Sequence, residues 1–236
     1  MTAGAPTPTK TRAQFHEELG GLERQALGAI DLVVGQLDRV LEAVAHQDVE
    51  LAGFVIADDD RLDGRYLEVN QGILSLLALQ APVATDLRVT AALLHVIKHV
   101  ERMGDQCVNI AKLIPLAGHE PPVRQELIAK LLEMGQYARS EALQCRMAFA
   151  QRDVGLARDL VRQDRDINRL NREIFTMALS VGDDPDTREW AMHMVLAARA
   201  LERIGDNAVD IGEQTAFVVT GLFREFSDAS TSALGA

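Results

Sequence analysis

The chain is poor in aromatic residues, and this scarcity argues against a protein built on β-sheets. Phe, Trp and Tyr together make up 4% of its 236 residues. Ala, Leu, Val, Arg and Glu dominate instead, which is the composition of packed helices. Since 47% of the residues are apolar, the chain can bury a sizeable core. The composition therefore predicts an all-α protein.

Basic charge is also scarce. The chain has 24 Lys and Arg residues against 35 Asp and Glu residues, which gives a formal net charge of −11. Nucleic-acid binding needs a basic stripe, so we expect no nucleic-acid partner. Anionic membrane surfaces and the electrostatic capture of free phosphate are disfavoured for the same reason. An acidic surface suits cations or a basic patch on another protein.

The chain has only two cysteines and no long uninterrupted apolar run. Cys107 and Cys145 fall in expected helices without C-x-x-C spacing, which favours reduced, buried thiols in a cytoplasmic protein. The first ten residues, MTAGAPTPTK, contain no apolar core of a signal peptide, and no window approaches 18 uncharged apolar residues. We therefore expect neither targeting nor membrane insertion.

Apolar periodicity predicts six long helices separated by short polar breaks. Helices of about 30 residues are near 45 Å long, so they must lie side by side to bury their apolar faces. Residues 1–10 and 227–236 are small and polar, which predicts disorder. The six expected helices cover residues 11–46, 48–79, 83–116, 123–151, 153–181 and 186–224.

The sequence contains an internal repeat. ERMGDQCVNI at 101–110 shares six of ten residues with ERIGDNAVDI at 202–211. AHQDVELA at 45–52 likewise answers AQRDVGLA at 150–157, with Asp48 and Asp153 placed to cap the helices that follow. The repeat predicts two tandem three-helix bundles of antiparallel helices, spanning residues 11–118 and 119–226.

The duplicated segments carry acids four residues apart on one helical face, at the border of the apolar stripe. Such like-charged pairs cost a helix about 0.2–0.5 kcal/mol, so a compensating role is expected. Carboxylates on successive turns suit hard cations, which predicts a metal site in each repeat. The repeated acids are Glu101 and Asp105 in one copy and Glu202, Asp206, Asp210 and Glu213 in the other, with Asp59, Asp63 and Asp164 on the preceding helices.

A purely structural interpretation stays open for the same acids. Lys98 and Arg199 stand three residues before Glu101 and Glu202 and can form ordinary surface ion pairs. Gly104 and Gly205 are kept in both copies although Gly costs a helix about 1 kcal/mol, which indicates a close helix approach that packing alone can also explain. The acids would then be solvated parts of a helical scaffold.

Histidine and catalytic motifs give little support to an enzyme. His95 and His99 have a zinc-like spacing, but His99 lies about 200° from Glu101 around the helix, which favours solvated or interfacial side chains. The chain lacks G-x-S-x-G, the P-loop, H-E-x-x-H and the E-x-x-H pairs of di-iron enzymes. We expect no enzyme, although a carboxylate-bridged oxidase or phosphate-ester hydrolase remains an alternative.

These motifs resemble the PhoU family of phosphate-transport regulatory proteins. LALQAPVATDLRVTAALLHVIKHVERMGDQCVNIAKL at 77–113 is similar to the family signature, and LERIGDNAVDIGEQTAFVVTG at 201–221 is similar to its closing repeat. The resemblance implies two three-helix bundles in a non-enzymatic regulator. We expect it to be a cytoplasmic homodimer, although periodicity alone does not distinguish a monomer from a dimer. Such a protein couples the ATPase of the phosphate ABC transporter to the sensor histidine kinase of a two-component system, and restrains the phosphate-starvation response.

The resemblance also implies metal binding at the paired acidic motifs. Iron, zinc, magnesium or manganese are the candidate ions, and no organic cofactor is expected. Two departures from symmetry are visible: Asp210 replaces the usual Asn, and Asn168 stands where Asp63 of the first copy predicts an acid. Carried over residue by residue, the candidate ligands are Glu101, Asp105, Asn109, Glu202 and Asp206.

Asp86 and Arg88 belong to the D-L-R triplet of the same signature. We expect them either to contact a partner protein or to support the start of their own helix. Repeat two has Thr187-Arg188-Glu189 at the matching positions, so the two copies differ here.

Overall fold

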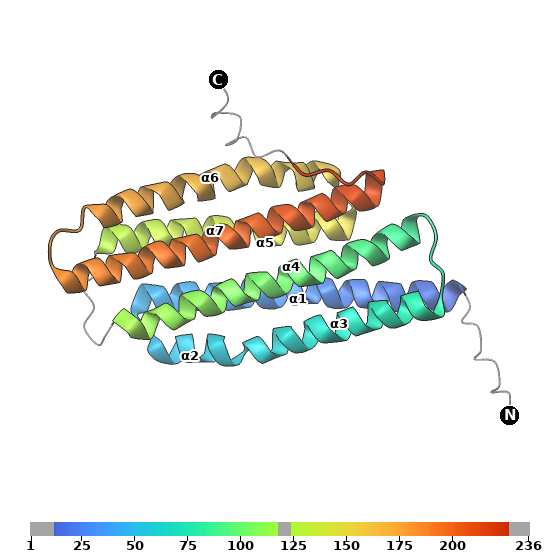
Figure 1. The fold of residues 1–236 in the computed structure, drawn as a ribbon, viewed down its shortest axis with the longest axis horizontal. Helices are drawn as coiled ribbons and strands as arrows, with labels where there is room; N and C mark the ends of the chain where they lie inside the picture. The colour runs from blue at the N-terminus through green and yellow to red at the C-terminus, as the bar shows by residue number, and fades with distance from the viewer. Residues whose placement is uncertain (1–11, 118–123, 227–236) are drawn as a thin grey trace, which may run out of the picture.

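The computed structural model describes residues 12–117 and 124–226, and every regular element in these two ranges is helical (Figure 1). The predicted all-α class and tandem three-helix bundles are thereby confirmed. No helix in the described ranges has an apolar stretch long enough to cross a lipid bilayer. The elements are α1 (Arg12–His46), α2 (Val49–Ala57), α3 (Asp59–Leu79), α4 (Thr85–Leu113), the 3₁₀ turn η1 (Ile114–Ala117), α5 (Gln125–Gln151), α6 (Val154–Leu179) and α7 (Pro185–Thr220).

Three aspartates fix the starts of helices. Asp48 accepts a hydrogen bond from the backbone N–H of Leu51 at 2.9 Å, and Asp153 accepts from the N–H of Leu156 at 3.0 Å. Both predicted caps are thus confirmed. Asp184 caps α7 by accepting from the N–H of Thr187 at 2.9 Å. Each carboxylate satisfies a backbone donor that a helix start leaves unpaired.

The second expected helix is divided into α2 and α3 at Asp58. This residue ends α2, because its N–H donates to the carbonyl of Phe54 at 2.9 Å, and its own carbonyl accepts from the N–H of Arg61 at 3.2 Å as α3 begins. Its carboxylate is held by Arg39 of α1, with Nη2 2.9 Å from Oδ2. An acidic run at a helix start is favoured by the helix dipole, and this explains a break without Gly or Pro.

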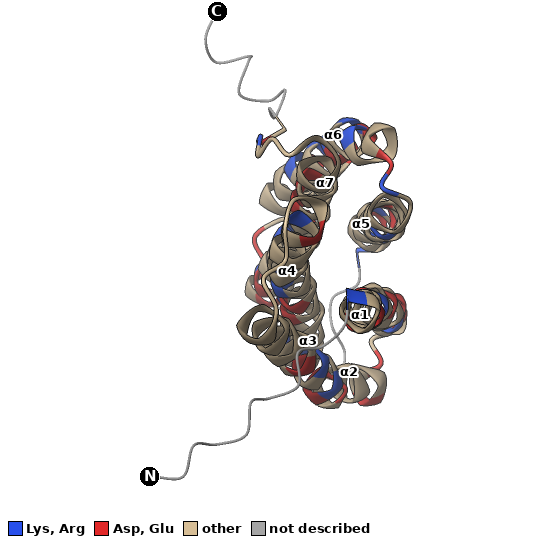
Figure 2. Ribbon diagram, turned by 90° about the vertical axis from the view of Figure 1, so that its right-hand side faces the viewer, with Lys and Arg blue, Asp and Glu red and all other residues tan. Residues whose placement is uncertain are grey.

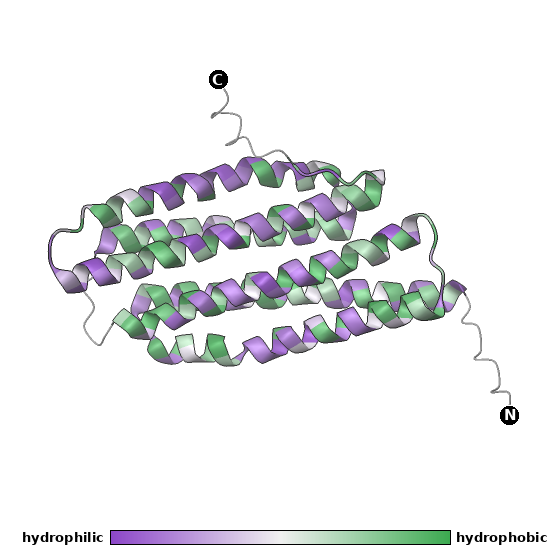
Figure 3. Cartoon of the chain, viewed as in Figure 1, coloured by the Kyte–Doolittle hydropathy of each residue, from purple (hydrophilic) through white to green (hydrophobic). Residues whose placement is uncertain are grey.

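The helices form two layers. Seen from the end of the molecule, α3, α4, α7 and α6 lie side by side in one layer, and α1 and α5 pack against one face of it (Figure 2). Helices of different repeats meet within each layer. In one layer α4 packs against α7, and in the other α1 packs against α5. On the layer's other face, seen in Figure 3, hydrophilic residues recur along α4 and α7 and dominate α6. The acidic motifs of both repeats therefore belong to one layer.

Packing and ion pairs hold α1 against α5. The side chain of Leu41 occupies the space where a larger residue at position 135 would have its Cβ. A Cβ added to Gly135 would lie 2.3 Å from Cδ2 of Leu41. Three ion pairs flank this contact. They join Arg139 to Asp38 at 2.6 Å, Arg146 to Asp31 at 2.7 Å and Arg152 to Glu23 at 2.8 Å.

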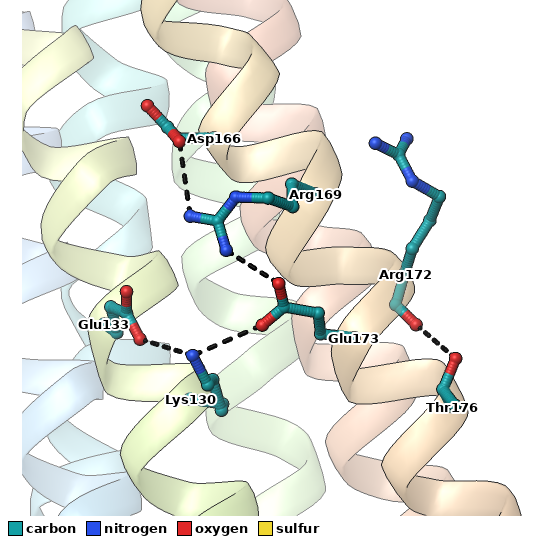
Figure 4. Close-up of polar contacts among 7 residues, drawn as sticks. All are labelled: Lys130, Glu133, Asp166, Arg169, Arg172, Glu173 and Thr176. Atoms are coloured by element: carbon teal, nitrogen blue, oxygen red, sulfur yellow. Dashed lines mark hydrogen bonds and ion pairs between the residues drawn. The ribbon is translucent and has the colours of Figure 1, made fainter.

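Surface ion pairs also tie α5 to α6 (Figure 4). Lys130 of α5 lies 3.0 Å from Glu133 and 3.2 Å from Glu173 of α6. Glu173 in turn accepts from Arg169 at 2.7 Å. The hydrogen bonds from Arg169 and Lys130 lower the pKa of Glu173. Such exposed pairs each contribute little to the stability of the fold.

Three sequence predictions fall outside the described residues. The expected disorder of residues 1–10 and of 227–236 lies there, and so does the domain boundary placed after residue 118.

Candidate cation-binding grooves

In the first repeat, the acidic motif lies at the edge of the buried face of α4. Val100, Met103 and Gly104 are buried, whereas Asp105 is exposed. The predicted border position is therefore confirmed. Glu101 is only 17% exposed and accepts a hydrogen bond from Lys98 at 2.7 Å. This motif acid thus already has a cation beside it.

The acids of α3 meet those of α4. Burial raises the pKa of Asp105, and the charges of Glu101 and Asp63 raise it further. Burial likewise raises the pKa of Asp59, followed by the charges of Asp63 and Asp105. Mutual repulsion of this kind requires proximity, so the structure brings these four predicted residues into one cluster. We call the four the first acidic cluster.

Two lysines partly neutralise the first acidic cluster. Lys112 lowers the pKa of both Asp59 and Asp105, and Lys98 lowers that of Asp105. Asn109, which was predicted beside the acids, is exposed and donates to Oε1 of Gln106 at 3.4 Å.

In the second repeat, the acids line a hollow of about 290 Å³ between α6 and α7. Five carboxylates reach it, from two helices and the segment after α7. Glu202 stands apart from them and pairs with Arg199, as Glu101 does with Lys98. The lining residues are Val161, Asp164, Asp206, Val209, Asp210, Glu213, Glu225 and Phe226. We call this space the second acidic hollow.

The segment 222–226 closes one side of the second acidic hollow. After Gly221, which has φ +73° and ends α7, the chain turns back toward α6 (Figure 1). The N–H of Phe226 donates to Oε1 of Glu213 at 2.5 Å. Burial raises the pKa of Glu213, and the charges of Asp210 and Glu225 act in the same direction. The end of the described chain is thus part of the hollow's wall.

Glu141 of α5 is a buried acid beneath these groups. It is fully buried, and neither carboxyl oxygen has a hydrogen-bond partner. Burial raises its pKa to about 9, with further contributions from the charges of Asp164 and Asp206. Glu141 therefore carries a proton at neutral pH.

The side chain of Asn168 points to Asp164. Its amide nitrogen donates to Oδ2 of Asp164 at 2.6 Å. In the second copy the amide thus orients a carboxylate where the first copy has a pair of acids, Asp59 and Asp63.

His99 lies in the seam between the repeats. Its Nδ1 is 2.9 Å from Oδ1 of Asn207 and 3.3 Å from Oδ2 of Asp210, both on α7. His95 is exposed. The expectation of interfacial or solvated histidines is confirmed, and Asp210 contacts the opposite repeat as well as the hollow.

Asp86 and Arg88 both make contacts within the chain. Asp86 is 3.1 Å from Nε2 of His16, on α1. Arg88 donates from Nε to the carbonyl of Val218 at 3.0 Å, and so holds the end of α7. Arg88 of the first repeat therefore links α4 to α7 of the second repeat.

The donors in the first acidic cluster and in the second acidic hollow are carboxylate oxygens, which suit hard cations. Within residues 12–117 and 124–226, no three Asp, Glu, His or Cys side chains stand close enough together to hold a metal ion without moving. Binding would therefore require changes of side-chain rotamer. The orphaned carboxyl of Glu141 and the all-oxygen donor set fit a cation in the second repeat.

The sequence motifs did not reveal Glu141. A signal was nevertheless present, because Glu141 interrupts the apolar stripe of Met134, Ala138 and Cys145 on α5. When the two copies are aligned with an offset of 105 residues, Glu141 matches Gln36 of α1, which is also buried and polar. A polar residue at the same core position of both copies marks a position that packing alone does not explain.

The fold and the acidic motifs define a class of duplicated helical proteins. In this class, two three-helix bundles share a layer that bears paired acidic motifs. The family model described as "PhoU domain" matches this chain twice, over residues 28–114 and residues 131–215. The chain therefore belongs to the PhoU family, and the family predicted from the sequence is confirmed.

Individual relatives match along most of their length. The chain is 30% identical over 208 residues to a protein of Zymomonas mobilis named phosphate-specific transport system accessory protein PhoU homolog, covering 88% of this chain and 87% of that one. A Clostridium acetobutylicum protein of the same name is 27% identical over 220 residues, covering 92% of this chain and 100% of its own.

Solved structures show the same fold. The crystal structure of the phosphate transport system regulatory protein PhoU from Streptococcus pneumoniae superposes with a TM-score of 0.82 at 26% identity, covering 89% of this chain and 99% of that one. PhoU from Pseudomonas aeruginosa gives a TM-score of 0.80, also at 26% identity, over 89% and 100% of the two chains.

Proposed function

We propose that this chain regulates phosphate uptake by binding other proteins of the phosphate transport system, and that it is not an enzyme. The observation that carries the proposal is the PhoU domain matched in both repeats. Relatives that align over nearly their whole length are named accessory proteins of phosphate-specific transport. The acidic motifs support the proposal because their carboxylates can pair with basic groups of a partner.

The partners we propose are the ATPase of the phosphate ABC transporter and the sensor histidine kinase of the phosphate two-component system. In this scheme the protein is a cytoplasmic homodimer and restrains the phosphate-starvation response when phosphate is plentiful. These assignments follow from the family resemblance. Asp86, next to Arg88 at the junction of α1, α4 and α7, is the partner-contact candidate we would vary first.

A reporter experiment tests this regulatory role. Deleting the gene in its own organism should switch on phosphate-starvation promoters in phosphate-rich medium, and the intact gene should restore repression. Repression that survives the deletion would overturn the proposal. Affinity capture with the purified transporter ATPase and, separately, with the sensor kinase identifies the partner, with an Asp86→Ala variant showing whether this residue is part of the surface.

We further propose that the two acidic motifs bind hard cations. The support is the carboxylate donor set and the pKa of Asp105, which burial raises and which the charges of Glu101 and Asp63 raise further. Asp105→Ala combined with Asp206→Ala should abolish the metal retained by the purified protein, measured by elemental analysis. The matched control is Glu17→Ala with Glu42→Ala, which removes two exposed acids of α1.

Thermal unfolding gives an independent test of cation binding. A cation that binds only the folded chain, at one hundred times its Kd, stabilises it by about 2.7 kcal/mol and raises Tm by about 5–10 °C. Scans with Fe, Zn, Mg or Mn ions should therefore differ from a scan with EDTA. Indifference to all four ions would leave the acids as solvated parts of a scaffold.

A further inference from the structure

Glu141 occupies a position that packing and hydrogen bonding leave unexplained. Its carboxyl group is fully buried in the second repeat, and both oxygens lack a partner. A buried polar group without a hydrogen bond costs about 1–3 kcal/mol, so native structures seldom keep one without a role. Its position behind a hollow lined by five carboxylates points to an ionic ligand.

The absence of a Cβ at Gly205 lets the side chains of Glu141, Ile167 and Asp164 approach the α7 backbone closely. A Cβ at this glycine would stand 2.9 Å from Oε2 of Glu141 and 3.0 Å from Oδ1 of Asp164. Two carboxyl groups, from α5 and α6, thus face the same point on the α7 backbone. Asp164 also lines the second acidic hollow, together with Asp206, the residue that follows Gly205. The hollow and the buried Glu141 are therefore connected through Asp164.

The first repeat fills the matching point with uncharged groups. A Cβ at Gly104 would meet Cδ2 of Leu62 at 2.1 Å and Oε1 of Gln36 at 3.3 Å. Gln36 is the repeat counterpart of Glu141, so the first copy has a neutral amide where the second has a carboxyl group.

Counter-charge differs between the copies as well. Lys112 stands near Asp59 and Asp105 in the first acidic cluster. The repeat offset of 101 residues places Glu213 at the matching position of the second copy, where it lines the hollow. At this position the second repeat therefore has a carboxylate where the first has an ammonium group.

We propose that the second repeat holds a hard divalent cation at an inner position formed by Glu141, Asp164 and Asp206, and binds it more tightly than the first repeat does. This inference rests on the cation binding proposed above and adds a ligand from α5, outside the E-x-x-x-D motifs. On binding, Glu141 releases its proton and the three carboxylates turn toward the ion. Affinity for hard cations rises with the number of carboxylate ligands.

Titration with Mn²⁺ tests the inner position. Isothermal calorimetry, with EPR of the unbound ion as a second measurement, should show a tighter and a weaker component in the full chain. Glu141→Gln preserves shape but cannot lose a proton to become a carboxylate ligand, so it should weaken the tighter component at least tenfold. Asp164→Asn should do the same, and it keeps the test valid if one variant folds poorly. Glu126→Gln, an exposed acid on the same helix, is the matched control and should bind as the unaltered chain does.

The outcomes separate this inference from the proposed function. Asp105→Asn should reduce the weaker component and retain the tighter one. If Glu141→Gln binds Mn²⁺ as tightly as the unaltered chain, the inner position is wrong while cation binding stands. The same conclusion follows if Asp105→Asn removes the tighter component. If the unaltered chain binds no Mn²⁺, the inner position and the proposed cation binding both fail.

Discussion

Gly135 of α5 and Leu41 of α1 fit together so closely that no larger residue can replace the glycine without movement. A Cβ at position 135 would lie 2.3 Å from Cδ2 and 2.7 Å from Cδ1 of the leucine. Both residues are buried, and the contact joins the two repeats. The duplicated bundles are therefore held together by a steric fit as well as by ion pairs.

Gly135→Ala should destabilise the protein. Overpacking a closed core costs about 1–3 kcal/mol, and the better helix propensity of alanine returns only about 1 kcal/mol of it. Urea denaturation followed by circular dichroism measures the difference. Gly53→Ala is the matched control, because nothing lies within 4 Å of a Cβ at position 53 in α2. That control should gain stability, and an equal gain at position 135 would contradict the close fit.

Glu141 should make stability fall as pH rises. Its pKa is 4.5 in the unfolded chain and about 9 in the folded chain, so between these values the folded protein holds a proton that the unfolded chain has lost. The contribution is fully present below pH 4.5 and decreases toward pH 9, by at most about 1.4 kcal/mol per pH unit. Comparing urea denaturation of the unaltered chain and Glu141→Gln across this window isolates the effect. Parallel curves would show that Glu141 does not titrate as described.

Arg88→Ala should loosen the end of α7. The arginine donates to the carbonyl of Val218 and to Oγ1 of Thr85, each at 3.0 Å. Losing a hydrogen bond from a charged group costs about 1.5–3 kcal/mol, reduced here by partial exposure. Amide hydrogen exchange near Val218 should accelerate. Arg102→Ala, at an exposed position of α4, should leave this exchange rate unchanged.

Both thiols should resist modification in the folded protein. Cys107 and Cys145 are free and fully buried. Burial raises the pKa of Cys107 to about 12 and raises that of Cys145 as well, so neither forms a thiolate at neutral pH. An exposed-thiol reagent should therefore react only after denaturation, with two thiols per chain. Fast reaction of the native protein would indicate local opening of α4 or α5.

The sequence predicts the fold well because its signals are local. Asp48 and Asp153 mark helix starts because each accepts a hydrogen bond from a backbone N–H three residues further on. The repeated decapeptides place their acids at the edge of the apolar stripe. The break at Asp58 was not predicted, since no Gly or Pro marks it. The arginine that holds the carboxylate of Asp58 comes from another helix, which no local pattern specifies.

The candidate site was predicted only in part. Helical spacing places Asp105 with Glu101, and the structure adds Asp59 and Asp63 from α3. The role of Glu141 could not be derived from spacing, because it depends on the point where α5, α6 and α7 meet. The partner of Arg88 is likewise a carbonyl 130 residues away, which no motif specifies.

The position of Phe226 matters for how the protein is handled. Its N–H is bound to Glu213, so Phe226 lies at the edge of the second acidic hollow. A polyhistidine purification tag joined directly after Phe226 would add metal-chelating imidazoles beside these carboxylates and disturb the measured cation affinity.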